Sequence, residues 1–189
     1  MDTINVMKRV IGQTQTIVDR VSPDELAKPT PCAEWTVRDV INHITGGATM
    51  FAECISDGSI ADERMAKLFG GDNLGDDYKG AFKQATDKVI ATFAEPGMMD
   101  KMVRLPFGEM PAGIALNIAV FDVTTHAADL AWATGQAIDD TDLLETALAV
   151  GREIIGPDMR KPGMFDPEQE VDASAGVADR LLAFAGRTV

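Results

Sequence analysis

Both histidines of this chain lie in stretches that predict helices, and His126 follows the carboxylate of Asp122 by four residues. Asp122 and His126 stand at positions i and i+4, which share one face of a helix. Carboxylate oxygens and imidazole nitrogens are both zinc ligands, so this pair can bind one ion. His43, brought there on another helix, would be a third ligand and leave one position open for water or substrate. The spacing therefore predicts a catalytic metal centre.

A simpler interpretation of these residues stays open. A single histidine on an apolar helix is more often a hydrogen-bonded core or surface residue than a ligand. An acidic residue four positions before a histidine is also a common pattern by chance. The pattern alone does not separate a metal site from a pair of satisfied core side chains.

Three further residues bear on the predicted site. Asp129 follows His126 by three residues, so its carboxylate is expected to accept a hydrogen bond from a ligand imidazole and orient it. Alternatively, it is a solvated or capping carboxylate near the helix end. Gly46 and Gly47 follow His43 by three and four residues, and each glycine costs a helix about 1 kcal/mol relative to alanine. They are expected to open a pocket beside His43, unless they permit close helix packing or break the helix.

The elements that must position these residues are nearly all helical, which predicts an all-α fold. Apolar residues at three- and four-residue steps predict four bundle helices, at about residues 4–21, 36–56, 77–94 and 111–135. A capping box from Thr36 to Asp39 opens the second helix, and Gly135 closes the fourth. A Gly- and Asp-rich crossover at 56–77, with one possible helical turn at 63–68, joins the second and third helices.

A short extended segment or small hairpin is expected at residues 101–111, just before the fourth bundle helix. Two shorter helices, at about 142–155 and 175–185, form a small carboxy-terminal appendage. The predicted organisation is therefore a bundle over residues 1–135 with a helical appendage over 136–189. The apolar residues Leu143, Leu144, Leu148 and Ile154 would pack on the bundle or on a second subunit, so both a monomer and a homodimer stay open.

Composition narrows the possible partners. The chain has 189 residues, a formal net charge of -13 and a sequence pI near 4.4, which argues against nucleic acid or an anionic membrane as a partner. Its two cysteines are too few for a disulfide framework and fit a reducing compartment. The amino end lacks the pattern of a signal peptide, and the apolar run at residues 112–121 is too short to span a bilayer. We therefore expect a cytoplasmic protein.

Three more side chains are candidates for a role in the site or in packing. Arg104 precedes the fourth bundle helix and is a candidate for binding a substrate carboxylate through its planar guanidinium, or else an exposed arginine on a turn. Trp35 is expected to pack at the start of the second helix, with a role in binding as the alternative. Cys32 is interpreted as a small buried residue, because no histidine lies near it in sequence to activate the thiol.

Longer motifs now point to a family. The segment from Pro29 to His43 (PTPCAEWTVRDVINH) resembles the amino-terminal signature of the mycothiol-dependent maleylpyruvate isomerase-like proteins, a branch of the DinB-like metal-binding superfamily. The resemblance continues from Asp122 to Gly135 (DVTTHAADLAWATG) and in the tail segment DRLLAFAGR at residues 179–187. It therefore covers nearly the whole chain.

The resemblance implies a DinB-like four-helix bundle with a divalent metal, usually zinc, bound by His43, Asp122 and His126; nickel is the alternative metal for this chain. It also implies mycothiol or a similar low-molecular-weight thiol as cosubstrate. The characterised isomerase has glutamate where this chain has the shorter Asp122, and often the family has tryptophan where this chain has Ala128. The characterised isomerase also has a longer carboxy-terminal domain than this chain.

These inferences give one leading hypothesis and two alternatives. The leading hypothesis is a metal-dependent transferase or isomerase, in which a metal-bound thiolate attacks a small electrophile. Metal-assisted hydrolysis is the nearest enzymatic alternative. A metal-binding sensor or interaction module without turnover is the third, because a fold and a metal site do not fix a reaction.

Overall fold

The chain is described by a computed structural model at residues 3–106, 108–161, 165–172 and 174–189. Seven α-helices occupy this part of the chain: α1 (Thr3–Arg20), α2 (Val37–Asp57), α3 (Asp62–Gly70), α4 (Tyr78–Ala94), α5 (Ala112–Thr134), α6 (Thr141–Ile154) and α7 (Val177–Phe184). One antiparallel hairpin, β1 (Met102–Leu105) with β2 (Gly108–Pro111), precedes α5. The predicted all-α class is confirmed.

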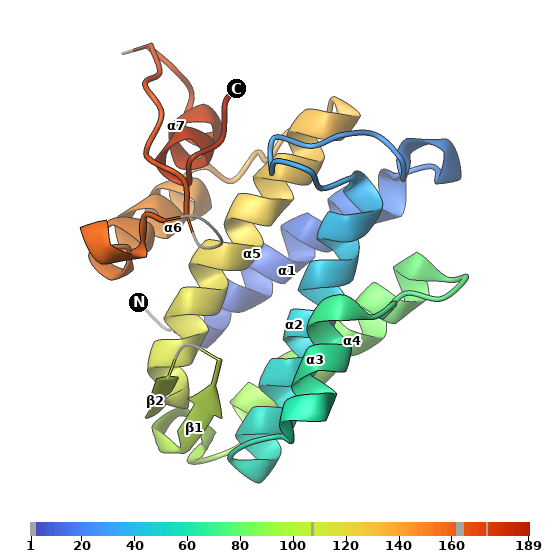
Figure 1. The fold of residues 1–189 in the computed structure, drawn as a ribbon, viewed down its shortest axis with the longest axis vertical. Coiled ribbons are helices and arrows are strands. Elements are labelled where there is room, and N and C mark those ends of the chain that lie inside the picture. The colour runs from blue at the N-terminus through green and yellow to red at the C-terminus, as the bar shows by residue number, and fades with distance from the viewer. Residues whose placement is uncertain (1–2, 107, 162–164, 173) are drawn as a thin grey trace.

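The helices α1, α2, α4 and α5 form a four-helix bundle (Figure 1). The most extensive packing joins α2 with α4 and α1 with α5. Within each of these pairs the two helices run in the same direction (Figure 1), which α3 makes possible by returning the chain along the bundle between α2 and α4. The predicted crossover between the second and third bundle helices is therefore present.

The crossover holds more structure than the sequence predicted. A nine-residue helix, α3, replaces the single expected turn, and it begins with Asp62 and Glu63 and has Lys67 in its last turn. Those charges complement the helix dipole. Because glycines and aspartates surround this segment, the sequence predicted only one helical turn here. The loop after α3 is fixed by Asn42 of α2, whose amide donates to the Gly71 carbonyl at 2.9 Å and whose carbonyl oxygen accepts from the Asn73 backbone N–H at 2.7 Å.

The hairpin lies where the extended segment was predicted. Val103 and Leu105 of β1 are buried, whereas Met102 and Arg104 are exposed, as expected for a strand with one face on the core. Phe107, in the predicted segment, lies outside the described residues. The hairpin connects α4 to α5 at the end of the bundle far from the α5 carboxyl terminus (Figure 1).

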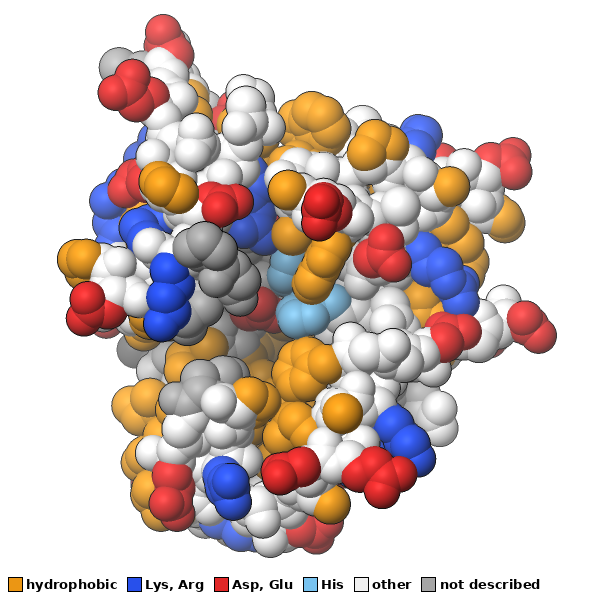
Figure 2. Space-filling view, in the orientation of Figure 1, with side chains coloured by type: hydrophobic (Ala, Val, Ile, Leu, Met, Phe, Trp, Pro, Cys, Tyr) orange, Lys and Arg blue, Asp and Glu red, His pale blue; other side chains and the backbone are white. Residues whose placement is uncertain are grey.

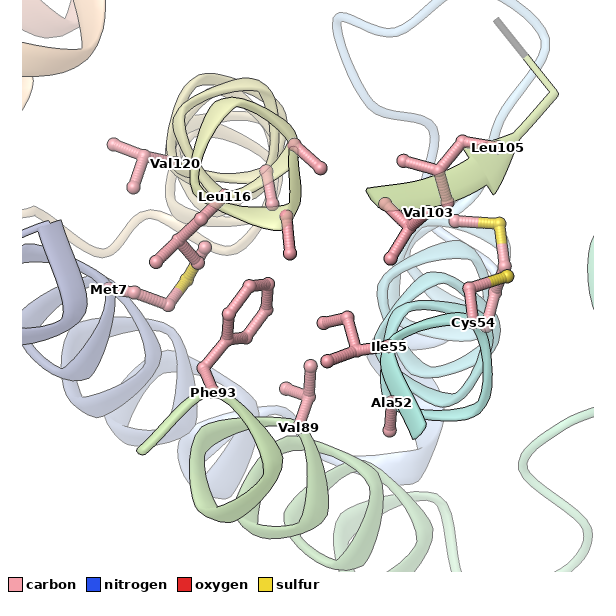
Figure 3. Close-up of a cluster of buried hydrophobic side chains, with 14 of the residues drawn as sticks. Met7, Ala52, Cys54, Ile55, Val89, Phe93, Val103, Leu105, Leu116 and Val120 are labelled. Atoms are coloured by element: carbon pink, nitrogen blue, oxygen red, sulfur yellow. The ribbon is translucent and has the colours of Figure 1, made fainter. Parts of the chain in front are cut away.

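Two hydrophobic clusters fill the bundle. Figure 3 shows one of them, in which Met7, Phe93 and Leu116 meet from α1, α4 and α5. The other cluster includes Ile41 and Leu130 and lies nearer the start of α2. Burying large aliphatic and aromatic side chains in this way is the main driving force for folding.

The helix α5 is the core helix of the bundle. It is 23 residues long and, by length and hydropathy alone, apolar enough to cross a membrane, and 72% of its most apolar window is buried inside the protein. The apolar run predicted at 112–121 is therefore part of a longer apolar helix. Its apolar surface packs against α1, α2 and α6 on several sides.

The appendage helices α6 and α7 pack on α5 through a third hydrophobic cluster. Its buried members include Phe121 of α5, Leu144 and Leu148 of α6, and Phe184 of α7. The apolar face of α6, for which the sequence left two partners open, therefore packs on the bundle. An ion pair of 2.6 Å between Arg9 and Asp140 links α1 to the start of α6. The division into units at residue 135 stays a prediction.

Candidate metal centre

Two helices bring the three predicted ligands together. His43 comes from α2, and Asp122 and His126 come from α5. The Asp122 carboxylate lies between the imidazoles, with Oδ2 3.5 Å from His43 Nε2 and Oδ1 3.7 Å from His126 Nε2. One ligand atom from each residue lies within 4.8 Å of the others. This spacing is that of side chains that can share one ion.

Local structure explains why these side chains converge. The Thr36 side chain accepts from the Asp39 backbone N–H and the Asp39 carboxylate accepts from the Thr36 N–H, so the predicted capping box sets where α2 begins. His43 then follows two turns into the helix. On α5, the four-residue spacing stacks Asp122 and His126 on the face toward α2. The side chain of Asp122 is 42% exposed, that of His43 23% and that of His126 7%.

Asp129 holds the His126 ring. Its Oδ2 lies 2.9 Å from His126 Nδ1, and Asp129 is completely buried. A carboxylate at this position favours the tautomer with the proton on Nδ1, which leaves the Nε2 lone pair directed at Asp122 and His43. The structure thus places Asp129 where the sequence predicted it, one hydrogen bond behind a candidate ligand.

Arg187, near the carboxyl end, is a site residue that the sequence analysis did not single out. Its guanidinium donates to both Asp129 oxygens, at 3.2 and 3.4 Å, and to the Ala185 carbonyl at 2.8 Å. The Arg187 side chain is only 12% exposed. A buried carboxylate requires such a partner, because an unpaired charge in the protein interior is very costly. The burial of Asp129 indicates that it needs a charged partner such as Arg187, but this burial follows only from the fold.

The charged side chains of the site shift one another's pKa values. Burial favours a higher pKa for Asp122, but the neighbouring His43 and His126 outweigh this effect and hold the pKa at about 2. Burial disfavours protonated His43, yet the adjacent Asp122 carboxylate leaves its pKa raised overall. Asp122 is therefore an ionised carboxylate, ready as an anionic ligand, at neutral pH.

The triad of His43, Asp122 and His126 lines a cleft of about 770 Å³. Figure 2 shows the histidine side chains within this hollow, with hydrophobic side chains around them. Trp35 stacks on His126 with ring centroids 5.4 Å apart, and its centroid lies 4.9 Å from that of His43. Trp35 does pack near the start of α2, but it also forms a wall of the cleft. Other aromatic lining residues are Phe69, Phe121 and Phe165.

Cys32 also lines the cleft, half-buried, as a small residue beside the triad. Burial raises the pKa of its thiol to about 11. The Cys32 sulfur, His126 and Asp129 also lie close enough together to suggest a second ion site. However, Arg187 lies 3.4 Å from the Cys32 sulfur, so a fixed positive charge already occupies that place.

Three residues predicted to line the pocket lie elsewhere. Gly46 and Gly47 are not among the residues that line the cleft. A Cβ at Gly46 would overlap the Leu68 carbonyl, so this glycine permits α3 to pack closely on α2. Gly47 faces a separate space inside the bundle. Arg104 is exposed on β1 and lines another depression, beside the hairpin, so the structure does not bring it to the triad.

Comparisons with known proteins identify the family. The mycothiol maleylpyruvate isomerase N-terminal domain matches residues 8–131. An uncharacterized protein of Mycobacterium tuberculosis strain CDC 1551 is 35% identical over 191 residues, which cover 100% of both chains, and one of strain H37Rv matches equally well. The chain belongs to the mycothiol maleylpyruvate isomerase N-terminal domain family.

A solved structure shares the fold of this family member. The crystal structure of the mycothiol-dependent maleylpyruvate isomerase matches with a TM-score of 0.63 and 14% identity, covering 79% of this chain and 66% of that one. A histidine-to-alanine variant of that enzyme matches to the same extent. The predicted DinB-like bundle is thereby confirmed. The triad and Asp129 lie inside the family-matched segment, whereas Arg187 lies beyond it.

Proposed function

We propose that this family member binds a divalent metal, zinc or else nickel, through His43, Asp122 and His126. The observation that carries the proposal is the convergence of three ligand atoms from two helices at the floor of an open cleft. Three protein ligands with a free position are the arrangement of catalytic zinc sites. The hydrogen bond from His126 to Asp129 supports it further, because metal-binding histidines almost always have such a partner.

We further propose a thiol-dependent reaction, S-transfer or isomerisation, on a small electrophile. A divalent metal in this site would supply Lewis acidity and lower the pKa of a bound thiol. The name of the solved relative, a mycothiol-dependent isomerase, supports mycothiol or a similar thiol as cosubstrate. The cleft volume of about 770 Å³ lies within the usual range of ligand sites, roughly 300–1,000 Å³, and leaves room for both reactants.

The residues of the chain have distinct tasks in this scheme. Asp129 holds His126 in one tautomer, and Arg187 neutralises the buried Asp129 charge. Trp35 and Phe69 form apolar walls of the cleft, against which an apolar part of a substrate would pack. The shorter Asp122, in place of glutamate, stays between the two imidazoles. We also propose that the protein is cytoplasmic and is either a monomer or a homodimer.

Two other functions fit the same triad. In metal-assisted hydrolysis, bound water would replace the thiol as nucleophile. In a sensor or interaction module, ion binding would have no turnover. The two enzymatic hypotheses differ in whether added thiol is required for activity.

Isothermal titration calorimetry with Zn²⁺ tests the metal site directly. The wild type is expected to bind one ion, and His43→Ala, Asp122→Ala and His126→Ala are each expected to lose at least about tenfold in affinity, because each removes a ligand. Glu34→Ala, which changes an exposed acidic residue of the same cleft, serves as the matched control and should bind normally. A wild type that binds no zinc or nickel would refute the proposal. Activity on electrophiles, with and without added thiol, then separates transfer from hydrolysis.

A further inference from the structure

A small cavity lies inside the bundle, behind the triad. We call it the bundle cavity, and its volume is about 30 Å³. All four bundle helices contribute to its wall, which is lined by Met7, Ile11, Ile44, Gly47, Ala48, Phe51, Thr86, Val89, Phe93, Ala119, Asp122 and Val123. Figure 3 shows Met7, Val89 and Phe93 directed into the space between the helices.

The bundle cavity is apolar apart from one end. Of the described residues that line it, Asp122 alone is ionisable, and the Thr86 hydroxyl already donates to the Phe82 carbonyl at 2.9 Å. The volume exceeds the roughly 10–15 Å³ that one water occupies, but a stable buried water needs about two to four polar partners. The walls do not offer these partners away from Asp122. Apolar cavities of this kind stay dry and bind apolar ligands.

Gly47 leaves part of this space unfilled. It lies in α2 one turn after His43, and a Cβ at this position would meet no atom within 4 Å. Its neighbour Gly46 is different, because α3 packs against it. Glycine is unfavourable inside a helix. No close backbone approach explains it at Gly47, so its structural effect is the space that it leaves in the bundle.

Asp122 borders both the cavity and the cleft. It lines both spaces, so its side chain borders the proposed metal position on one side and the apolar interior on the other. A small molecule with its polar reactive group at the triad could therefore direct an apolar substituent past Asp122 into the bundle. The polar end would stay in the cleft, and only hydrocarbon would enter.

We propose that the bundle cavity is a specificity pocket for a short, unbranched alkyl group of the electrophilic substrate. The small volume favours a chain of a few carbons, and the four-helix wall disfavours branched or polar groups. This inference rests on the proposed function, because the metal would fix the other end of the molecule.

Xenon binding tests the cavity without metal or activity. In ¹²⁹Xe NMR of the metal-free protein, the wild type should show a saturable xenon shift, because xenon enters dry apolar cavities. Gly47→Leu is expected to fill the space and abolish the shift, and Gly47→Ala to weaken it. Gly12→Leu makes the same change at an exposed position of α1 where a Cβ also meets nothing, so it should leave the shift intact. Circular dichroism confirms that each variant is folded.

A homologous series of metal-binding ligands tests the substrate assignment. Acetohydroxamate and its longer straight-chain homologues, up to six carbons, are titrated into zinc-loaded protein. Each early methylene should tighten binding by roughly fourfold, the value expected for burying one CH₂ group, until the cavity is full. In Gly47→Leu, with unchanged zinc affinity, the gain per methylene should disappear.

The outcomes separate the two proposals. A wild type without a xenon shift, or with the same chain-length dependence as Gly47→Leu, would show a packing defect only and overturn the pocket while the metal site stands. A wild type that fails to bind zinc would overturn the proposed function and the substrate assignment with it. A xenon shift and a chain-length gain that both vanish in Gly47→Leu would support the pocket.

Discussion

At the scale of single residues, Asp129 connects the candidate ligand His126 to Arg187. Its carboxylate accepts from His126 on one side and from Arg187 on the other, with no solvent exposure. Replacing one partner of such a buried network leaves the others unsatisfied, and the cost is then larger than the hydrogen bond itself. The orientation of His126 therefore depends on a residue that would not touch the metal.

Asp129→Asn should weaken zinc binding by about 10- to 100-fold, the usual effect of removing the partner of a metal-binding histidine. The amide keeps the size of the side chain but loses the charge that fixes the Nδ1 proton. Calorimetry with Zn²⁺ gives the affinity, and Asp142→Asn, an exposed change on α6, is the control. Unchanged affinity would show that the carboxylate does not set the state of His126.

Cys32 should be a slow nucleophile although it lines the cleft. Burial raises the pKa of its thiol from an ordinary value of 9.0 to about 11, so the thiolate fraction at pH 8 is about 100-fold below that of an unperturbed thiol. Alkylation by iodoacetamide, followed by peptide mass spectrometry, should be correspondingly slow at pH 8 and should accelerate as the pH rises toward 11. Rapid labelling at pH 7 would contradict this environment.

The sequence predicted that Asp122, His126 and Asp129 lie together because their spacing on α5 is local information, whereas the place of His43 beside them depends on how α2 packs. Asp122, His126 and Asp129 share a helix face whatever the tertiary fold. Arg187 could not be found in the same way, since it is 58 positions from Asp129. Nor could the misassigned Arg104 be excluded, because its distance from the triad depends on how the hairpin packs.

At the scale of elements, the two adjacent glycines of α2 have different structural effects. Gly46 is buried against the end of α3, and its missing side chain brings two helices together. Gly47, one position later, faces the bundle cavity. Sequence alone offered pocket, close packing and helix break as alternatives. The choice between these alternatives depended on the position of α3, a helix that the glycine-rich sequence of the crossover did not predict.

Gly46→Ala and Gly47→Ala should therefore change stability in opposite directions. The added methyl group at Gly46 would overlap the Leu68 carbonyl and crowd the Asn73 amide, so we expect a loss of about 1–3 kcal/mol in the free energy of unfolding. At Gly47 the methyl group has room, and the helix should gain up to about 1 kcal/mol. Urea denaturation measures both variants. Equal effects would contradict the different surroundings of the two positions.

Helix boundaries followed from capping and periodicity to within a few residues. The bundle helices expected at 4–21, 36–56, 77–94 and 111–135 are found at 3–20, 37–57, 78–94 and 112–134. These elements are long and have clear starts, such as the capping box at Thr36. The short α3 lacked such a start, because Ala61 precedes it and provides no side-chain cap.

For the whole molecule, the main consequence is that the site joins segments from both ends of the chain. The cleft takes residues from the loop at 29–35, α2, α3, α5 and the carboxy-terminal tail. A ligand that binds only when all of them are in place stabilises the folded chain as a unit.

Zinc should therefore raise the melting temperature. At a free concentration 100 times the dissociation constant, binding adds about 2.7 kcal/mol, which corresponds to about 5–10 °C for a chain of this size. Differential scanning fluorimetry with added Zn²⁺, and again with excess chelator, measures the shift. The double variant Asp122→Ala/His126→Ala should show no shift, and a wild type unaffected by zinc would argue against the metal centre.

The stacking of Trp35 on His126 gives the protein a built-in optical signal. The chain has two tryptophans, and the other, Trp132, is exposed outside the cleft. Trp35 alone lies against the candidate ligands, so a quenching ion such as Ni²⁺ or Cu²⁺ at the triad would darken one indole and spare the other. In a Trp132→Phe background, emission would report occupancy of the site in real time, before any substrate is known.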